Sequence, residues 1–369
     1  MQKPLYLLIC SLLILIVPLV HAAPFQQALP GYPYQFPKDH ASHNNFKTEW
    51  WYYTGHLKTD AGKNYGYELT FFRSNPGIKN LPTKTNWALN NIYFAHFAVS
   101  DESGKKFFHT QKLGRGHSKM DAGLFGAETD KYHVWTQNWQ ATLDKDTHHL
   151  AAATPEFGIN LDLTPAKPLV IHGKNGVSQK ASCKGCASHY YSYSRLNTHG
   201  TLHINGKSHP VTGQSWMDHE FGSNQLTDEQ TGWDWFSIQL DNNMELMLYI
   251  LRQKDGGADP NSGGTLINAN GKSRYVPLTE FNVIPIDEWK SPRSGGTYPM
   301  GWKINLPEEN INLTITPAFP NQELHTQIPN GITYWEGACR VTGTVQGKKI
   351  TGQAYVEMTG YAEQFRQDI

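Results

Sequence analysis

The sequence predicts a mostly β protein built as two tandem antiparallel β-barrels with little helix. Short runs of alternating polar and apolar residues follow one another from residue 46 onward, separated by turn-forming segments rich in Gly, Asn, Asp and Pro. An aromatic block occurs twice, and few windows show helical periodicity beyond two turns. Many short strands must protect their edges by closing into barrels or packing into sandwiches. Two units of this length suit two barrels.

The aromatic block divides the chain into two related units. Residues 50–57 (WWYYTGHL) align with residues 233–240 (WDWFSIQL) after a shift of 183 positions, which is 240 minus 57. A second similar run follows each copy. Because an internal repeat determines architecture, we predict a first domain at residues 23–222 and a second at residues 223–369.

The individual strands are predicted from alternation and from the turns that bound them. In the first unit they lie at residues 49–58, 65–73, 92–100, 132–143 and 158–163. In the second they lie at residues 233–240, 245–252, 264–268, 275–279, 311–317 and 340–345. The segment 174–188, with two glycines and two cysteines, is expected to form an ordered or stapled loop near a cavity mouth.

The N-terminus has the pattern of an export signal. Lys3 precedes an apolar run at residues 5–20, and a small-residue exit ends at Ala22. We therefore predict a signal peptide at residues 1–22 and an exported protein, periplasmic or secreted. Pro18 interrupts the run and no stop-transfer pattern follows, so a retained membrane helix is the weaker alternative. After signal removal no transmembrane segment is predicted.

Composition narrows the range of partners. The 32 basic and 32 acidic residues cancel, and no long basic run is present, so nothing attracts nucleic acid electrostatically. Aromatic residues make up 12% of the chain and charged residues only 17%, which favours interiors or cavities lined by rings. The composition identifies no protein partner.

The cysteines suggest a local cross-link. In an exported protein Cys183 and Cys186 are candidates for a disulfide, with Cys339 buried and free. The alternative is a zinc site in which His172 or His189 completes the ligand set of the two cysteines, although a second Cys-x-x-Cys is missing. A thioredoxin-type role requires a helix after the first cysteine, and no such pattern is visible.

Several blocks together resemble the AttH/CrtC family of lipocalin-like proteins, which includes carotenoid hydratases and is often labelled as predicted secreted hydrolases. The resemblance implies two lipocalin-like barrels, an apolar small-molecule ligand and no cofactor. It also implies diverse activities, among them hydration of isolated double bonds and of an isoflavonoid, and cyclisation or isomerisation. The blocks lie at residues 49–57, 69–73, 189–192, 213–222 and 232–236.

The resemblance also implies a catalytic group. Carotenoid hydratases have an aspartate two residues after an aromatic, preceded by a His-x-aromatic pair. Trp216-x-Asp218 and His189-x-Tyr191 stand at the matching positions. The hydratase pattern has tryptophan in place of Tyr191 and tyrosine in place of Trp216, so we expect retained chemistry and a different substrate.

Hydration of an unactivated alkene needs a proton donor strong enough to make a carbocation. An acid in a ring-lined cavity meets this need because desolvation raises its pKa, and Asp218 is the candidate. Trp216 and Tyr191 are expected to stabilise the cation, and His189 to orient water or reset the proton. The further candidates for ligand contact are Trp51, Tyr53, His56, His96, Trp233 and Trp235.

Structural roles compete with these chemical ones. Asp218 can accept hydrogen bonds from turn N–H groups or pair with an arginine such as Arg195. Tryptophans in a repeated strand are core residues more often than ligand platforms. His56 and His96 alternate with apolar neighbours, so each is either a satisfied interior histidine or one facing a cavity.

Three classes of function remain open. The first is a ligand-binding protein that, if catalytic, acts as a hydro-lyase or isomerase. The second is a non-catalytic carrier of hydrophobic ligands, and the third is a structural or assembly factor of the cell envelope, favoured by solid cores in both barrels. Serine hydrolysis is disfavoured because no Gly-x-Ser-x-Gly elbow is present, and no pattern supports a metal.

Overall fold

The computed structural model describes residues 25–77, 91–116, 123–224, 226–326 and 331–365. The predicted signal peptide, residues 1–22, lies outside them. Across these described ranges, helix is confined to two 3-10 turns, η1 (Lys38–His40) and η2 (Leu278–Glu280). No helix there is long and apolar enough to cross a membrane. The prediction of a mostly β chain is confirmed.

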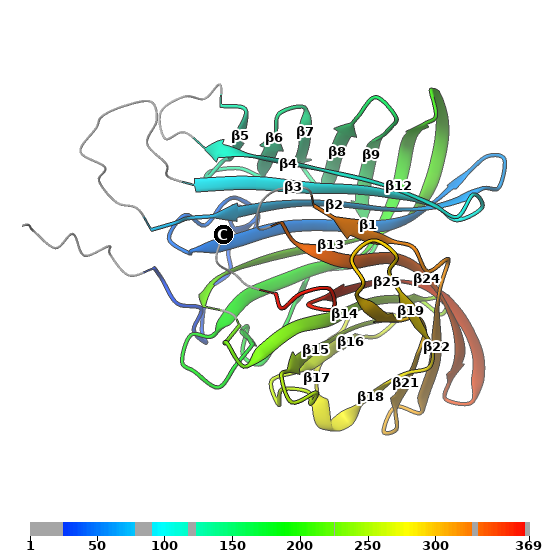
Figure 1. Cartoon of the computed structure of the whole chain (residues 1–369). Helices are drawn as coiled ribbons and strands as arrows, with labels where there is room; N and C mark the ends of the chain where they lie inside the picture. The colour runs from blue at the N-terminus through cyan, green and yellow to red at the C-terminus, as the bar shows by residue number, and fades with distance from the viewer. Residues whose placement is uncertain (1–24, 78–90, 117–122, 225, 327–330, 366–369) are drawn as a thin grey trace, which may run out of the picture.

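The first barrel is a 13-stranded antiparallel sheet that is nearly closed (Figure 1). Its strand order runs β4-β3-β2-β1-β13-β12-β9-β8-β7-β6-β5, and β4 contacts β5 at the far ends of this path. The strands are β1 (Thr48–Thr59), β2 (Asn64–Ser74), β3 (Asn91–Asp101), β4 (Lys106–Gly116), β5 (Phe125–Ala127), β6 (His133–Thr136), β7 (Trp139–Asp144), β8 (Thr147–Ala153), β9 (Phe157–Pro165), β10 (Val170–Ile171), β11 (Ser178–Gln179), β12 (Ala187–Ile204) and β13 (Lys207–Asn224).

The second barrel is a 10-stranded sheet with the order β17-β16-β15-β14-β25-β24-β22-β21-β18, and β23 pairs with β24. A separate hairpin joins β19 to β20. The fold is therefore two tandem lipocalin-like barrels, as predicted. The strands are β14 (Gln230–Leu240), β15 (Glu245–Gln253), β16 (Gly263–Ile267), β17 (Ser273–Pro277), β18 (Asn282–Pro285), β19 (Glu288–Lys290), β20 (Thr297–Pro299), β21 (Trp302–Leu306), β22 (Ile311–Pro317), β23 (Glu323–His325), β24 (Thr333–Val345) and β25 (Lys348–Thr359).

Each barrel is filled by its own hydrophobic core. Alternation along β1 sends Trp51 and Tyr53 into the first barrel, where they pack in its core. The residues that alternate with them, Trp50 and Tyr52, point the other way and join a third cluster that lies between the barrels. A strand that is buried on both faces explains why the aromatic block is nearly continuous in sequence.

Polar contacts fasten the two barrels together. Glu245 of the second barrel accepts a bond of 2.5 Å from Arg195 Nε and one of 2.6 Å from Lys167 Nζ, both of the first barrel. The Gln239 side chain donates to the backbone carbonyls of Ser194 and Ser215. Because these groups are buried and satisfied, they hold the inter-barrel seam in one arrangement.

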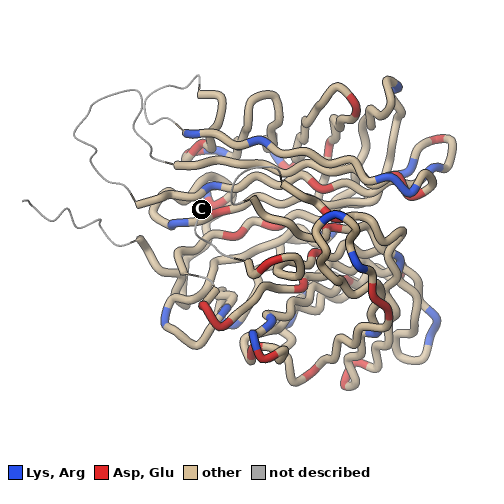
Figure 2. Tube along the Cα trace, viewed as in Figure 1, with Lys and Arg blue, Asp and Glu red and all other residues tan. Residues whose placement is uncertain are grey.

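Positively and negatively charged side chains are mixed over the surface of both barrels. Figure 2 shows Lys and Arg interspersed with Asp and Glu over both barrels, and no large region has a single sign. This distribution agrees with the balanced composition.

The segment 174–188 contains more order than a loop. It includes β11 and the start of β12, and a disulfide joins Cys183 to Cys186. Cys339 is buried and free. The predicted domain boundary at residues 222 and 223 falls within β13, and the second sheet begins at β14.

Candidate functional site

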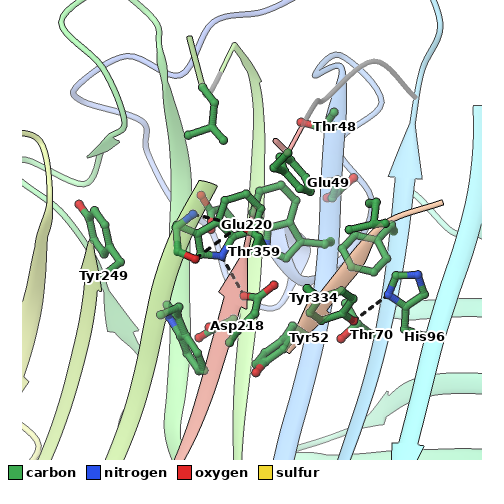
Figure 3. Close-up of a pocket in the computed structure, with 18 of the residues that line it drawn as sticks. Thr48, Glu49, Tyr52, Thr70, His96, Asp218, Glu220, Tyr249, Tyr334 and Thr359 are labelled. Carbon is green, nitrogen blue, oxygen red and sulfur yellow. Dashed lines mark hydrogen bonds between the residues drawn. The ribbon is translucent and has the colours of Figure 1, made fainter. Parts of the chain in front are cut away.

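A pocket lies in the seam between the two barrels. It has a volume of about 140 Å³. A cavity on the order of 150 Å³ accommodates a benzene-sized group, so this one suits a ring or a short branched segment of a lipophilic molecule. Figure 3 shows Asp218 in its midst, with Tyr52 nearby and Tyr334 bonded to His96 at one side. Its aromatic wall includes Trp50, Tyr52, Phe72, Phe94, Trp233 and Trp235.

Three side chains donate hydrogen bonds to Asp218 in this pocket. Ser192 Oγ and Trp216 Nε1 both donate to Oδ1, the indole at 2.6 Å, and the Tyr190 hydroxyl donates to Oδ2 at 2.7 Å. Asp218 is only 4% exposed. Burial raises its pKa to about 7, against the effect of the three donors. Asp218 can therefore hold a proton at neutral pH and release it to form a stabilised carboxylate.

A directed chain of hydrogen bonds leads to Asp218 from a buried histidine. Because Ser192 Oγ donates to Asp218, it accepts a bond of 2.6 Å from His172 Nε2. The other ring nitrogen, Nδ1, then accepts from Thr265 Oγ1 at 2.8 Å. Burial lowers the pKa of His172 to about 3, so the ring is neutral and the chain Thr265, His172, Ser192 ends at Asp218.

Three further carboxyl groups gather at the seam. Trp233 Nε1 donates to Glu357 Oε2 at 3.0 Å, and burial raises the pKa of Glu357 to about 8. Thr70 and Tyr334 donate to one oxygen of Glu68, whose pKa burial raises to about 7. Burial also raises the pKa of Glu336, which accepts from Tyr52 at 2.8 Å.

The structure brings five of the predicted site residues together. Asp218, His96, Trp233 and Trp235 line the pocket, and Trp216 is bonded to Asp218 beside it. Asp218 does not pair with Arg195, which pairs with Glu245 instead. The hydroxyl of Tyr190 accepts from Trp235 Nε1 at 3.0 Å, which links the two barrels at Asp218.

The other predicted residues lie elsewhere. His189 and Tyr191 point into the first barrel, where Tyr191 bonds His219 and His189 packs on Phe221. Trp51 and Tyr53 belong to the first core. His56 bonds the Ala354 carbonyl at 3.0 Å in another part of the seam. The predicted grouping of His189 and Tyr191 with Asp218 is wrong on these contacts.

The reason is strand parity. Asp218 pairs with Ser192 across the sheet, so Tyr190 and Ser192 share its face, whereas His189 and Tyr191 occupy the opposite face. The histidine near Asp218 is His172, placed by the short β10, which pairs with β12. Tyr190, Ser192, His172 and Glu357 are the residues that sequence reasoning missed. Alternation could have indicated the first two.

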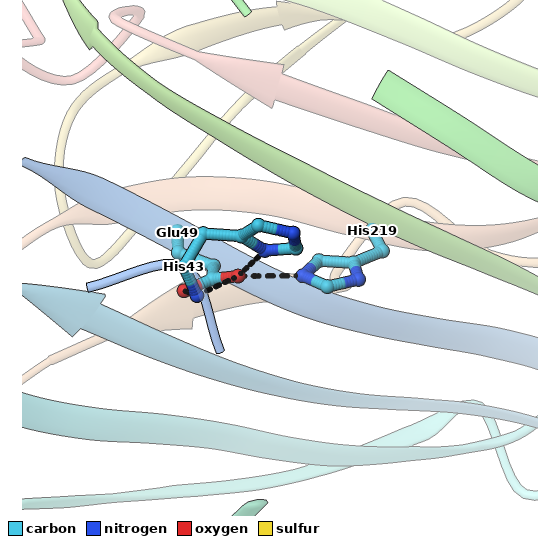
Figure 4. Close-up of side chains that lie close together, drawn as sticks. All are labelled: His43, Glu49 and His219. Atoms are coloured by element: carbon cyan, nitrogen blue, oxygen red, sulfur yellow. Dashed lines mark hydrogen bonds and ion pairs between the residues drawn. The ribbon is translucent and has the colours of Figure 1, made fainter. Parts of the chain in front are cut away.

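A second titratable cluster lies at the end of the first barrel. Glu49 Oε1 is 2.7 Å from His43 Nδ1 and 2.8 Å from His219 Nε2 (Figure 4). Arg73 and Ser42 donate to Oε2 at 3.0 Å. Burial opposes ionisation, but the histidines and Arg73 hold the Glu49 pKa well below its usual value.

His43, Glu49 and His219 are residue types that bind metals, and their donor atoms lie within 4.8 Å of one another. Both oxygens of Glu49 are nevertheless already engaged, and a cation there would face the Arg73 guanidinium. We assign the cluster a structural role: it ties the segment around His43 across the barrel end.

The fold and the pocket together define a lipocalin-like two-barrel protein with an acid-bearing cavity between its barrels. The chain belongs to the AttH-like family, whose model matches residues 27–361. Among solved structures it is similar to an AttH protein of Nitrosomonas europaea, at 33% identity and a TM-score of 0.82, covering 91% of this chain and all of that one. The family prediction is confirmed.

Two more distant structures share the fold. Kievitone hydratase from Nectria haematococca is 15% identical with a TM-score of 0.68, covering 93% of this chain and 97% of that one. CghA is 12% identical with a TM-score of 0.53, covering 94% and 96%. No curated protein matches the chain.

Proposed function

We propose that this protein is exported, binds a lipophilic small molecule between its barrels, and uses Asp218 to promote hydration or isomerisation of a double bond in that molecule. The observation that carries the proposal is a buried, hydrogen-bonded carboxyl group in a ring-lined cavity. The hydratase named among the structural relatives supports the same class of reaction by analogy of fold.

The chemistry begins with proton transfer. The O–H bond of protonated Asp218 breaks, a C–H bond forms at one alkene carbon, and the π electrons leave the other carbon cationic. The rings of Trp235 and Tyr52 stabilise this cation, each by about 1 to 2 kcal/mol when water is excluded. The carboxylate left on Asp218 is stabilised by Ser192, Trp216 and Tyr190.

The second half of the reaction determines the product. Addition of water forms a C–O bond and releases a proton, which gives an alcohol. Loss of a proton from a neighbouring carbon forms a shifted double bond instead. Both routes return one proton to the site and need no redox partner or cofactor.

The test compares the mature protein with Asp218→Asn, using farnesol and geranylgeraniol as alkene probes in deuterated water. The native protein should give products with carbon-bound deuterium, and the variant at least 100-fold less, because an amide cannot supply the proton. Quenching of tryptophan fluorescence should show equal probe binding by both. Equal turnover in both proteins removes Asp218 from the chemistry. Binding without turnover in either one indicates the carrier class.

Export has its own test. Expression of the whole chain followed by cell fractionation and mass measurement of the mature N-terminus should locate the protein outside the cytoplasm, beginning after Ala22. An intact N-terminus in the cytoplasm would contradict this part of the proposal.

A further inference from the structure

The two barrels present equivalent carboxyl groups to the pocket. Tyr52 on β1 pairs with Asp218 on β13, the last strand of the first barrel. Trp235 on β14 pairs with Glu357 on β25, the last strand of the second. Since 235 minus 52 is 183, Tyr52 and Trp235 are the same position of the aromatic repeat. Glu357 is therefore the counterpart of Asp218 in the second unit.

An indole also donates to each carboxyl group, from the same strand as Asp218 in one case and from the strand next to Glu357 in the other. Trp216 Nε1 donates to Asp218 Oδ1 at 2.6 Å, and Trp233 Nε1 donates to Glu357 Oε2 at 3.0 Å. Both acids line the same pocket. Among the ion pairs of the described ranges, none involves Asp218 or Glu357. Each is thus an acid held by an indole, and the ion pairs of the described residues include neither.

The remaining acids of the seam do not share this setting. Glu68 and Glu336 are fully buried and hold Thr70, Tyr334 and Tyr52 in place. Glu220 pairs with Lys180 at 3.0 Å. Glu357, in contrast, is partly exposed and faces the pocket. Glu68 and Glu220 line the pocket as well, but of these four acids Glu357 alone is partly exposed and occupies the repeat position of Asp218.

We propose that Glu357 is a second catalytic residue, which accepts the proton released on the opposite side of the substrate after Asp218 has delivered one. This inference rests on the proposed function and names the base that the reaction needs. In hydration, an O–H bond of water breaks as its oxygen bonds to the cationic carbon, and the proton passes to the Glu357 carboxylate. In isomerisation, the proton comes from the neighbouring C–H bond.

The two carboxyl groups also interact electrostatically. Burial and the negative charges of Glu68 and Asp218 raise the pKa of Glu357. Two acids that repel one another lose their protons in two separate steps, so an intermediate state holds one proton between them. In that state one carboxyl is an acid and the other is a base. After turnover the proton on Glu357 exchanges through solvent, and Asp218 is reloaded.

The experiment uses the mature protein with farnesol as the probe and compares Glu357→Gln, Glu357→Asp and Asp218→Asn. Glu288→Gln, at an exposed position on β19, is the control. Glu357→Gln should bind farnesol as the native protein does and lose at least 100-fold in turnover. Glu357→Asp should recover part of it, because a carboxylate remains, and the control should match the native protein.

A second measurement does not depend on turnover. The pH titration of the Asp218 side chain, followed by carbon NMR, should shift to lower pH in Glu357→Gln, because glutamine carries no charge to oppose ionisation. Native turnover and an unshifted Asp218 titration in Glu357→Gln, with Asp218→Asn inactive, would overturn this inference and leave the proposed function intact. Equal turnover in the native protein and Asp218→Asn would instead overturn both.

Discussion

The Tyr190 hydroxyl donates a hydrogen bond of 2.7 Å to Oδ2 of Asp218. Because Trp235 Nε1 in turn donates to Tyr190, this one phenol joins the acid of the first barrel to the aromatic block of the second. The acid and its pocket therefore depend on the docking of both units.

Replacement of Tyr190 by Phe should raise the pKa of Asp218. A hydrogen bond to a charged group contributes about 1.5 to 3 kcal/mol, which corresponds to roughly one to two pKa units. Carbon NMR titration of the Asp218 side chain measures the shift directly. Tyr191→Phe is the matched control, because Tyr191 bonds His219 and His40 inside the first barrel. A larger shift in the control would contradict the assigned strand faces.

Relative to the native protein, the Asp218→Asn variant should gain free energy of unfolding as the pH rises. Between the ordinary aspartate pKa and about 7, the folded protein holds a proton that the unfolded chain has lost. The contribution of Asp218 to the free energy of unfolding is therefore fully present below the ordinary aspartate pKa and is lost as the pH rises through about 7. Urea unfolding at several pH values measures the difference between the two proteins. The exposed Asp60→Asn should show no such trend, and a flat difference for Asp218→Asn would argue against a buried neutral acid.

Glu245→Ala should strongly destabilise the protein. The substitution leaves Lys167 and Arg195 buried without their partner, at side-chain exposures of 3% and 8%. Removal of one member of a buried pair costs about 3 to 5 kcal/mol. Urea unfolding of Glu245→Ala is to be compared with Arg274→Ala, whose side chain is 38% exposed and whose loss should cost about 0 to 1 kcal/mol. Similar losses for both would show that the seam tolerates unpaired charge.

Loss of the disulfide should have a smaller effect. Chain-entropy arguments assign about 2 kcal/mol to a loop as short as the one closed by Cys183 and Cys186. The double Cys→Ser variant should therefore unfold at a lower urea concentration and keep its binding of farnesol. A variant in which Cys339→Ser is the only change tests whether the effect belongs to the bridge. Loss of farnesol binding in the double variant would show that the bridge also shapes the pocket.

The sequence was most informative where a local pattern repeats. Alternation and turn residues predicted the β-barrels, and the block at Trp50 and Trp233 predicted the two units. Family resemblance led to Asp218, and Asp218, Trp233 and Trp235 all line the inter-barrel pocket. Such features depend on neighbours in the chain, which a single sequence displays.

Long-range pairing could not be inferred in the same way. His172 reaches Asp218 through Ser192 only because β10 pairs with β12, and these short contacts leave no periodic signal. The choice of His189 and Tyr191 failed because one step along a strand reverses the face of the sheet. Glu357 was detectable in principle, but its equivalence to Asp218 requires the register of β14 with β25.

A hydrophobic cluster fills each barrel interior, and the ring-lined cavity lies between the barrels. Packed interiors alone would favour a purely structural protein, but the inter-barrel cavity supplies space for a ligand. The walls of that space belong to outward faces of the strands, which are set apart from the residues that fold each half. Substitutions there can remodel what the protein recognises while the two cores keep their packing, so one scaffold can diversify its chemistry at little cost in foldability.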